Sequence, residues 1–441
     1  MASDTWRECS VEELKSSAAN ALATGPFGSA ISSRFFQSSG VPVIRGSNLS
    51  QDIGIRIIDD GLAFVSDDKA SEFNRSIARR GDLVFTCWGT IDQVGLIDGR
   101  AKFSKYVVSN KQMKLTPDST KADSLFLYYV FSSPQMRNTI LNQGIGSSVP
   151  GFNLGQLRRL PLLLPPIGEQ RAIASILGAL DDKIELNRRM NETLEAMARA
   201  TFKSWFVDFD PVRAKLDNRP PKALDPQTAA LFPDSFEHAE FGLVPDGWNV
   251  STVGDEFKLT MGQSPPGETY NETGDGIPFF QGRRDFGFRF PSVRVFCTGP
   301  TRFAEKNDTL VSVRAPVGDL NLASQRCCVG RGVAAVRHKS GSRSYTYYAM
   351  GGLETDFARF EAEGTVFGSI NKRNFQALPM IAPTETVVSA FDRLVGPMDD
   401  RIEVNSSQGE TLAATRDALL PKLLSGELRV KDAEKLAESH L

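Results

Sequence analysis

The sequence has few of the side chains from which disulfide frameworks and metal centres are built. Its 441 residues include five cysteines, an odd number, and no two of them stand at a CxxC spacing. This pattern argues against both a disulfide framework and a thiolate zinc site. Only three histidines occur, widely separated at His238, His338 and His440, which argues against a histidine-rich metal centre.

Long apolar runs are also absent. No window reaches the roughly 18 apolar residues of a membrane span, and the N-terminus lacks a basic region followed by an apolar run. We therefore expect neither secretion nor membrane insertion, and we expect a cytoplasmic protein in a reducing compartment.

Motifs of nucleotide sites and common catalytic centres are missing as well. The sequence contains no GxGxxG after a strand, no GxxxxGK[ST], no GxSxG, no HExxH and no Asn/Asp-Pro-Pro-Tyr. Asp181-Asp182 and Asp399-Asp400 are paired carboxylates, but adjacent side chains on a helix point in different directions. A capping or inter-helix role is favoured over a metal site. We expect no catalytic residue, no bound metal and no cofactor.

What is present is an ordinary globular composition with segregated charge. Hydrophobic residues make up 41% and charged residues 24%, and the length predicts two to four domains. The net charge is −2, yet residues 1–160 hold 18 Lys+Arg against 15 Asp+Glu and residues 248–380 hold 16 against 13. Two mildly basic blocks therefore alternate with two acidic ones.

The chain also repeats itself once. Leu180-Asp-Asp-Lys-Ile-Glu-Leu-Asn187 returns as Met398-Asp-Asp-Arg-Ile-Glu-Val-Asn405. Upstream, further motifs return in the same order: Gly40–Gly46 as Gly276–Gly282, Asp82–Thr86 as Asp308–Ser312, Phe152-Asn153 as Ile370-Asn371, and Leu160-Pro161 as Leu378-Pro379. Chance does not produce so many matches in register, so we infer an internal duplication.

Each copy has two parts. The first, residues 1–164 or 248–382, is rich in Gly, Pro and short β-branched runs, which predict short strands with little helix. The second, residues 165–214 or 383–441, opens after a proline and predicts a long helix. Proline-rich residues 215–247 predict an irregular connector. The expected fold class is α+β: two pseudo-symmetric, β-rich globular domains separated by two long antiparallel, coiled-coil-like helices.

Both predicted helices carry an apolar seam with spacings of three and four residues. It contains Leu180, Ile184, Asn187 and Leu194 in the first copy and Met398, Ile402, Asn405 and Leu412 in the second. Two homologous seams in one chain predict that the helices pack on each other. Asn187 and Asn405 hold the same seam position, and we predict that they lie near a pseudo-twofold axis. Exposure of both to solvent is the alternative.

Three motifs resemble those of type I restriction–modification specificity subunits. They are Pro165-Pro-Ile-Gly-Glu-Gln-Arg-Ala-Ile173 with the Leu180–Asn187 motif, Ala200-Thr-Phe-Lys-Ser-Trp-Phe-Val-Asp-Phe-Asp-Pro211, and Leu420-Pro-Lys-Leu-Leu-Ser-Gly-Glu-Leu428. The resemblance extends over essentially the whole chain. The second copy departs from it at Pro383-Thr-Glu-Thr-Val387, which lacks the Glu-Gln pair of residues 169–170. We therefore do not expect the two helices to bind partners identically.

The resemblance implies a DNA sequence-specificity subunit that is not itself an enzyme. In this family two target-recognition domains each read one half of a split site in double-stranded DNA. The helices separate the domains and dock two modification subunits. Those subunits carry S-adenosylmethionine and methylate adenine at N6, and two restriction subunits that use ATP and Mg can join. Such systems act in phage defence. The chain itself would bind no cofactor and no membrane.

Helix length and sequence divergence predict the form of the site. About 26 helical residues from Asp181 to Phe206 span about 39 Å, or about 11–12 base pairs. Two half-sites would then lie roughly one DNA turn apart. Because the two β-rich blocks share few residues outside the framework motifs, we expect an asymmetric, non-palindromic site.

Cationic and amide side chains on predicted loops are the candidates for DNA contact. In the second domain they are Gln281, Arg283, Arg284, Arg289, Arg314 and Arg331, and in the first they are Arg45, Asn48, Lys102 and Lys105. Solvated surface charge is the alternative for each. The Gly-rich loops 144–148 and 364–368 are candidates for phosphate contact or for tight turns.

Two other functions remain open at this point. One is a pseudo-symmetric adaptor that binds only proteins, which the segregated basic blocks disfavour. The other is the DNA-recognition module of a nuclease whose catalytic residues go unrecognised, which the missing motifs disfavour.

Overall fold

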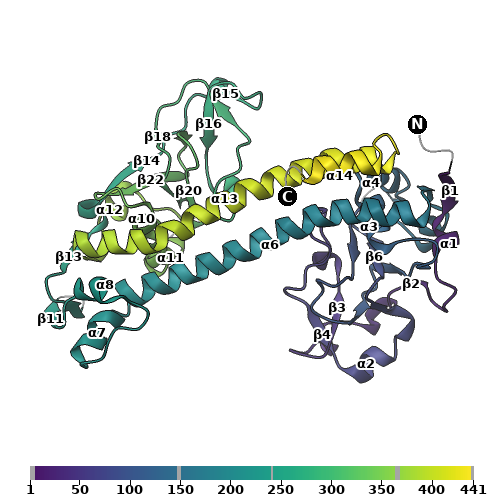
Figure 1. Ribbon diagram of the computed structural model, residues 1–441, viewed down its shortest axis with the longest axis horizontal. Coiled ribbons are helices and arrows are strands. Elements are labelled where there is room, and N and C mark those ends of the chain that lie inside the picture. The colour runs from purple at the N-terminus through teal and green to yellow at the C-terminus, as the bar shows by residue number, and fades with distance from the viewer. Residues whose placement is uncertain (1–4, 147–149, 240–241, 363–367, 439–441) are drawn as a thin grey trace. The chain divides into compact units, whose positions relative to one another are not determined.

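The computed structural model describes residues 5–146, 150–239, 242–362 and 368–438. The chain forms two compact units: unit 1 combines Met1–Arg188 with Ser407–Leu441, and unit 2 is Arg189–Ser406. Two helices of 40 residues, α6 (Ile167–Phe206) and α13 (Glu385–Leu424), each contribute to both units (Figure 1). Every unit therefore contains one β-rich domain and one stretch of each long helix.

The two long helices run antiparallel in each unit. Contacts in unit 1 join Asp181 to Arg416 and Asn187 to Gln408, and contacts in unit 2 join Asn191 to Asn405 and Phe202 to Phe391. Positions on α13 fall as positions on α6 rise, which is the antiparallel order. The expected fold class is confirmed.

The C-terminal segment is not one helix to its end. Helix α13 ends at Leu424, Gly426 adopts a φ of 72°, and α14 (Val430–Glu438) follows. A glycine in the left-handed region is a common helix terminator because it has no Cβ to clash. Helix α14 buries Ala433 and Ala437 in the core of unit 1. The break therefore lets the chain add a second helix to that core.

The β-rich domain of unit 1 has two four-stranded sheets and one strand pair. One sheet has the order β2 (Leu22–Thr24), β9 (Gln112–Leu115), β6 (Leu83–Thr86) and β7 (Val94–Leu96). The other has the order β4 (Ala63–Val65), β3 (Val41–Ile44), β8 (Lys105–Val108) and β5 (Ile77–Arg79). Strand β1 (Arg7–Ser10) pairs with β10 (Pro161–Leu164), directly before α6.

The β-rich domain of unit 2 repeats this topology. Strands β14 (Phe257–Met261), β22 (Val333–His338), β19 (Thr309–Val313) and β20 (Val317–Leu322) form one sheet, and β13 (Asn249–Thr252) pairs with β23 (Pro379–Ala382). The other sheet has the order β15 (Tyr270–Asn271), β17 (Phe296–Cys297), β16 (Ile277–Phe280), β21 (Cys327–Val329) and β18 (Phe303–Ala304). Strand β16 runs parallel to β21 as β3 runs parallel to β8. The duplication read from motifs is thus a duplication of fold.

The β-rich domains contain more helix than the sequence predicts. Unit 1 adds α3 (Ser124–Ser132), α4 (Pro134–Asn142) and α5 (Leu154–Arg159), and unit 2 adds α10 (Arg343–Gly352), α11 (Glu354–Ala362) and α12 (Lys372–Gln376). Most of α3 is buried, including Tyr128 and Tyr129. A helix that is apolar all round shows no amphipathic period, so the expectation of little helix was wrong.

The described part of the connector packs into unit 2. Helix α7 (Asp210–Leu216) leads into it, and it contains α8 (Pro226–Ala230) and the antiparallel pair β11 (Phe236–Ala239) and β12 (Gly242–Pro245). Phe232 and Val244 join the core that surrounds Trp205 and Trp248. Aromatic anchors therefore hold a proline-rich segment that local signals describe as irregular. Within the described residues, no helix is long and apolar enough to cross a membrane.

Candidate nucleic-acid interface

In unit 1, three loops meet where strands β3, β8 and β6 end. Ser109 N donates to Ile44 O at 2.9 Å, and Cys87 N donates to Lys111 O at 2.7 Å. These backbone bonds bring together the side chains of Arg45, Trp88–Thr90 and Ser109–Gln112, which we call the unit 1 loop end. It combines two cations with an indole that is 54% exposed.

The unit 1 loop end is hollowed. Its residues line a pocket of 630 Å³, together with Phe36 and Gly46. The Arg45 guanidinium donates to Gly61 O at 3.0 Å, while its Nε is buried without a hydrogen-bond partner among the described residues. The volume lies in the range of small-molecule sites, and the lining combines polar and apolar groups.

Unit 2 brings the equivalent loops together. Gly330 N donates to Phe280 O at 2.9 Å, Gly332 N to Gln281 O at 3.0 Å, and Val313 N to Gly332 O at 2.9 Å. The side chains that gather there are all exposed, and we call them the unit 2 loop end: Gln281, Arg283, Arg284, Arg314 and Arg331. Of these, Arg283 pairs with Asp319. Five of the six candidates named in this domain therefore share one edge.

Such an edge has the chemistry of a DNA-reading surface. Arginine can bind guanine O6 and N7 with two hydrogen bonds, and glutamine can do the same with adenine. Arginine also binds phosphates without sequence preference. Because the loops are tied to strand ends by backbone bonds, the side chains project from a rigid base.

Two of the predicted DNA contacts are wrong. Asn48 is 1% exposed, accepts from Arg45 N at 3.1 Å and donates to Ile58 O at 3.0 Å, so it fixes the turn after β3. Arg289 is 2% exposed and is held by Glu195 and Asp399. Both side chains therefore stabilise the interior and present nothing to a duplex.

Lys102 and Lys105 do not line the pocket of the unit 1 loop end. Lys105 begins β8, whose other end leads to Ser109. Lys102 pairs with Asp60 at 2.9 Å and Lys105 with Asp67 at 2.7 Å, in exposed ion pairs. Lys105 is thus separated from Arg45 by the length of β8, whereas Lys102 binds Asp60, next to the Gly61 whose carbonyl oxygen accepts from Arg45.

Sequence reasoning overlooked two residues that take their place. Trp88 and Asn110 follow strand ends in the first copy, as Arg314 and Arg331 do in the second. The motif Asp82–Thr86 aligns with Asp308–Ser312, so extending that alignment by two residues would have paired Trp88 with Arg314. These residues could have been identified by their position directly after a strand, but not by their residue type.

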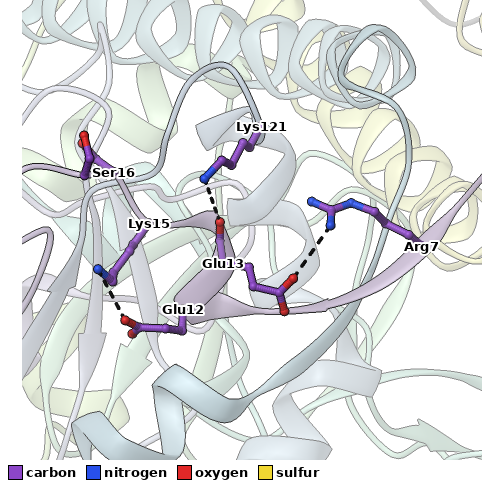
Figure 2. A pocket seen from close by; sticks show the side chains of 7 residues that line it. Arg7, Glu12, Glu13, Lys15, Ser16 and Lys121 are labelled. Atoms are coloured by element: carbon purple, nitrogen blue, oxygen red, sulfur yellow. Dashed lines mark hydrogen bonds and ion pairs between the residues drawn. The ribbon is translucent and has the colours of Figure 1, made fainter.

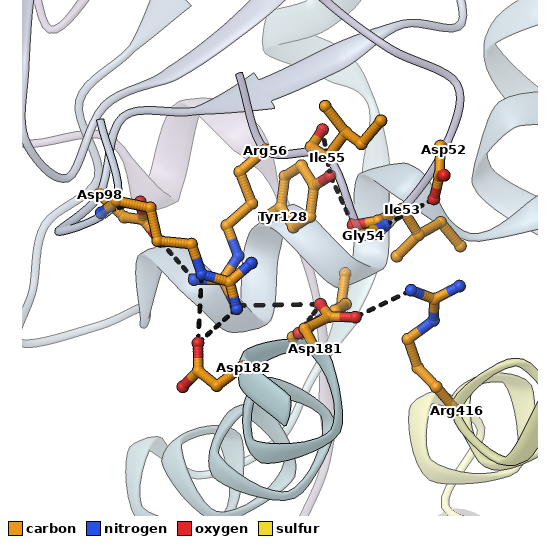
Figure 3. A network of polar contacts seen from close by, with 12 residues as sticks. Asp52, Ile53, Gly54, Ile55, Arg56, Asp98, Tyr128, Asp181, Asp182 and Arg416 are labelled. Carbon is orange, nitrogen blue, oxygen red and sulfur yellow. Dashed lines mark hydrogen bonds and ion pairs between the residues drawn. The ribbon is translucent and has the colours of Figure 1, made fainter. Parts of the chain in front are cut away.

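A buried ionic network joins the domain of unit 1 to the helices (Figure 3). On α6, Asp181 accepts from Arg416 Nη1 on α13 at 2.8 Å and from the Tyr129 hydroxyl at 2.5 Å. Arg56 lies 3.8 Å from Asp181 and also binds Asp98. Burial and the Asp181 carboxylate raise the pKa of Tyr129, which therefore stays a donor. Asp181 has the inter-helix role that was favoured over a metal site.

Unit 2 has a related network with a different charge balance. Asp399 on α13 accepts from the Tyr348 hydroxyl at 3.1 Å and lies 3.2 Å from Arg289, which also binds Glu195 on α6. One buried arginine thus serves two buried carboxylates. Burial raises the pKa of the Asp399 carboxyl, and Arg289 only partly offsets it.

The seam asparagines are buried and hydrogen-bonded between the helices. In unit 1, Asn187 Nδ2 donates to Gln408 Oε1 at 2.9 Å. In unit 2, Asn405 Nδ2 donates to Asn191 Oδ1 at 2.9 Å, and Asn191 Nδ2 donates to Ser406 Oγ at 3.2 Å. The alternative that Asn187 and Asn405 face solvent is therefore wrong.

The other seam residues are buried or partly buried. Leu180, Ile402 and Leu412 are buried, and Ile184, Leu194 and Met398 are partly buried. The outward face carries Leu186 and Val404, which occupy equivalent positions and are 53% and 55% exposed.

A second cavity in unit 1 is lined by charged side chains that pair with one another. It has a volume of 420 Å³, and Figure 2 shows its charges facing one another. Arg7 lies 3.8 Å from Glu13, Lys15 lies 3.4 Å from Glu12, and Lys121 Nζ donates to Glu13 O at 3.3 Å. Exposed pairs of this kind leave little net field for a ligand.

The last features predicted from the sequence are the lack of a metal site and the two Gly-rich loops. Within the part of the chain that the structure describes, no group of three His, Cys, Asp or Glu side chains could hold a metal ion. Ser147 and Ser148 of the first Gly-rich loop and residues 364–367 of the second lie outside the described residues.

The comparisons with known proteins fit this architecture. Residues 28–196 match the family described as type I restriction modification DNA specificity domain. The chain is therefore similar to type I restriction–modification specificity subunits. The match covers the first copy with most of α6, and the duplicated topology extends the architecture to the second.

Two relatives and one solved structure cover most of the chain. A putative type I restriction enzyme MjaX specificity subunit of Methanocaldococcus jannaschii is 27% identical over 403 residues, which are 89% of this chain and 88% of the relative. The type I restriction enzyme HindI specificity subunit of Haemophilus influenzae is 25% identical over 381 residues, 73% and 81% of the two chains. The crystal structure of a type I restriction–modification S subunit from M. genitalium has a TM-score of 0.61 at 17% identity, covering 95% and 96%, and shows the same fold.

Proposed function

We propose that this specificity subunit selects a split DNA site for a type I restriction–modification assembly. Unit 1 reads one half-site with its loop end, and unit 2 reads the other half-site with its loop end. The observation that carries the proposal is the meeting of equivalent loops in two copies of one fold, with exposed cations at both ends.

The two loop ends differ in chemistry, and this supports a non-palindromic target. Arg45, Trp88 and Asn110 in unit 1 stand where Gln281, Arg314 and Arg331 stand in unit 2. Different donors and acceptors select different base edges. The two half-sites should therefore differ in sequence.

In this proposal the subunit recognises the DNA sequence, and its partner subunits carry out the reactions. Specificity subunits are non-catalytic components of type I complexes. In our proposal two modification subunits bring S-adenosylmethionine, and restriction subunits that join bring ATP and Mg. The outward helix face around Leu186 and Val404 offers apolar surface at equivalent positions for docking. The buried seam side chains hold that face in place.

A map of N6-methyladenine tests this function directly. Cells that contain this subunit with its modification subunit should methylate a split motif with two unlike halves. Cells that lack only this subunit should lose that motif entirely. An unchanged map in an assembly with active modification subunits would refute the proposal, and identical half-sites would refute the asymmetry.

A further inference from the structure

We propose that the pocket of the unit 1 loop end binds a single nucleobase that has left the DNA stack. The inference rests on the proposed function, because the base comes from the half-site that unit 1 reads. In unit 2 the position of Gln112 is taken by Val333, so the two recognition domains would read DNA in different ways.

The strongest observation is a buried amide without a partner. Gln112 is 0% exposed and lines the pocket. Its Oε1 accepts from the Ser109 hydroxyl, while its Nε2 has no hydrogen-bond partner among the described residues. A buried donor left unpaired is costly, so native structures almost always satisfy it with protein, water or ligand. The Ser109 bond orients the amide so that Nε2 is the free end.

The backbone leaves a path from the pocket to that amide. Gly46 lines the pocket, and a Cβ built on Gly46 would lie 3.7 Å from Gln112 Nε2. Glycine keeps this space empty. A ring nitrogen or a carbonyl oxygen on the edge of a base could enter it and accept the hydrogen bond, and each of the four bases carries at least one such acceptor.

The remaining lining suits a nucleotide. Trp88 presents an exposed indole on which a base can stack, and stacking on aromatic rings is tolerant of base identity. Gly151 permits this placement, because a Cβ there would meet the Trp88 ring at 2.7 Å. Arg45 and Lys111 line the same pocket and can neutralise the flanking phosphate.

A paired base could not use this site. The edges of stacked pairs lie within a groove and are read by side chains that project into it. The arginines of the unit 2 loop end project in that way. The Gln112 donor is recessed beneath the surface, so the base must come to it. Enzymes that act on bases extrude them into pockets that combine stacking with hydrogen bonds to the base edge.

The duplicated fold provides matched variants. The backbone bond that Gln112 O accepts from Gly25 N at 3.0 Å returns as the bond of Val333 O with Gly262 N at 2.9 Å. Valine therefore fits this strand position, and Gln112→Val removes the donor from a fold that tolerates it. Gly46→Ala fills the path. Trp88→Ala removes the stacking platform, and Phe27→Ala removes a ring that is 72% exposed and does not line the pocket.

The experiment measures binding of the assembled complex to duplexes with one mismatch at each position of the unit 1 half-site. Only the strand opposite the candidate base is changed, so the base keeps its identity and loses its partner. Unpairing eases extrusion, so one position should bind about tenfold more tightly than the matched duplex. Every other mismatch in the half-site should weaken binding.

The variants then assign the gain to the pocket. Gln112→Val, Gly46→Ala and Trp88→Ala should each abolish it, whereas Phe27→Ala should retain it. Site-specific binding with no gain at any position would overturn the base pocket and leave the proposed function intact. If the wild-type complex shows no site-specific DNA binding at all, both the base pocket and the proposed function are overturned.

A second arm distinguishes a base of the DNA from a free nucleotide. Each of the four deoxynucleoside monophosphates is added to the complex without DNA, and quenching of tryptophan emission is compared with that of Trp88→Ala. Weak quenching, at millimolar concentrations or above, is expected for a base that must be delivered by the duplex. Micromolar binding of one mononucleotide, together with an absent mismatch gain, would show a nucleotide site and would overturn the DNA-base assignment.

Discussion

Arg416 on α13 donates to Asp181 on α6 at 2.8 Å, and both side chains are buried in unit 1. The same carboxylate binds Tyr129 and lies beside Arg56, so one aspartate joins the recognition domain to two helices. In unit 2, Asp399 on α13 is the corresponding buried aspartate, and it pairs with one arginine, Arg289. The helices are therefore more than spacers, because each β-rich domain is fixed to them by a buried charge.

Removing Arg416 should destabilise unit 1 strongly. Arg416→Met leaves Asp181 buried with weaker compensation, and breaking a buried pair on one side costs about 3–5 kcal/mol. Calorimetric unfolding of the full chain should show this loss in one of its transitions. Lys102→Met, which breaks an exposed pair with Asp60, should cost under about 1 kcal/mol. Equal effects of the two variants would contradict the assignment.

The stability of unit 2 should depend on the protonation of Asp399. Burial raises the folded pKa of this carboxyl above its ordinary value of 3.8, so the folded state binds the proton more tightly than the unfolded state. The stability that Asp399 contributes therefore falls as pH rises from about 3.8 through the raised pKa, and is constant above it. We expect the wild type to lose stability relative to Asp399→Asn across this window. Chemical unfolding from pH 4 to 7 measures the difference, and a flat difference would exclude the effect.

Arg331 should contribute to DNA affinity through charge. Replacing it by alanine should reduce the slope of log K against log salt concentration by about 0.9, the value for one lost phosphate contact. Arg326 is the matched control, because it is exposed and precedes β21 while Arg331 follows that strand. Arg326→Ala should leave the slope unchanged in filter-binding or anisotropy titrations of the assembled complex. A similar loss for both variants would mean that the loop end is not the contact surface.

The parts of the fold that the sequence predicts are those with a regular period or a repeated motif. The seam from Leu180 to Leu194 and its copy from Met398 to Leu412 have helical spacing, and the repeat identifies both β-rich blocks. Helix α3 was missed because its residues are apolar on every side. The break before α14 was missed because one glycine sets it and no proline marks it.

The candidate site was predicted less completely, for a physical reason. Arg284 and Arg289 are the same residue type within one basic run, yet Arg289 is buried against Glu195 and Arg284 is exposed. Burial of an arginine depends on a carboxylate contributed by a distant helix, which local sequence cannot reveal. Trp88 and Gln112 lack charge and so do not stand out as nucleic-acid ligands, although the fold places them beside Arg45.

Changing the length of the helices should change the gap between the half-sites. An insertion of seven residues preserves the three-four spacing of the seam, whereas an insertion of four or five would rotate it out of register. Placed after Asn191 in α6 and before Asn405 in α13, matched heptads add about 10 Å, which corresponds to about three base pairs. Both helices must be lengthened, because a single insertion would break the Asn191–Asn405 hydrogen bond and the contacts on either side.

The methylome of cells with the double insertion should retain both half-sites and show a gap about three base pairs longer. An insertion of seven residues in α6 alone should abolish methylation. An unchanged gap in the double insertion would show that something other than the helix pair sets the spacing.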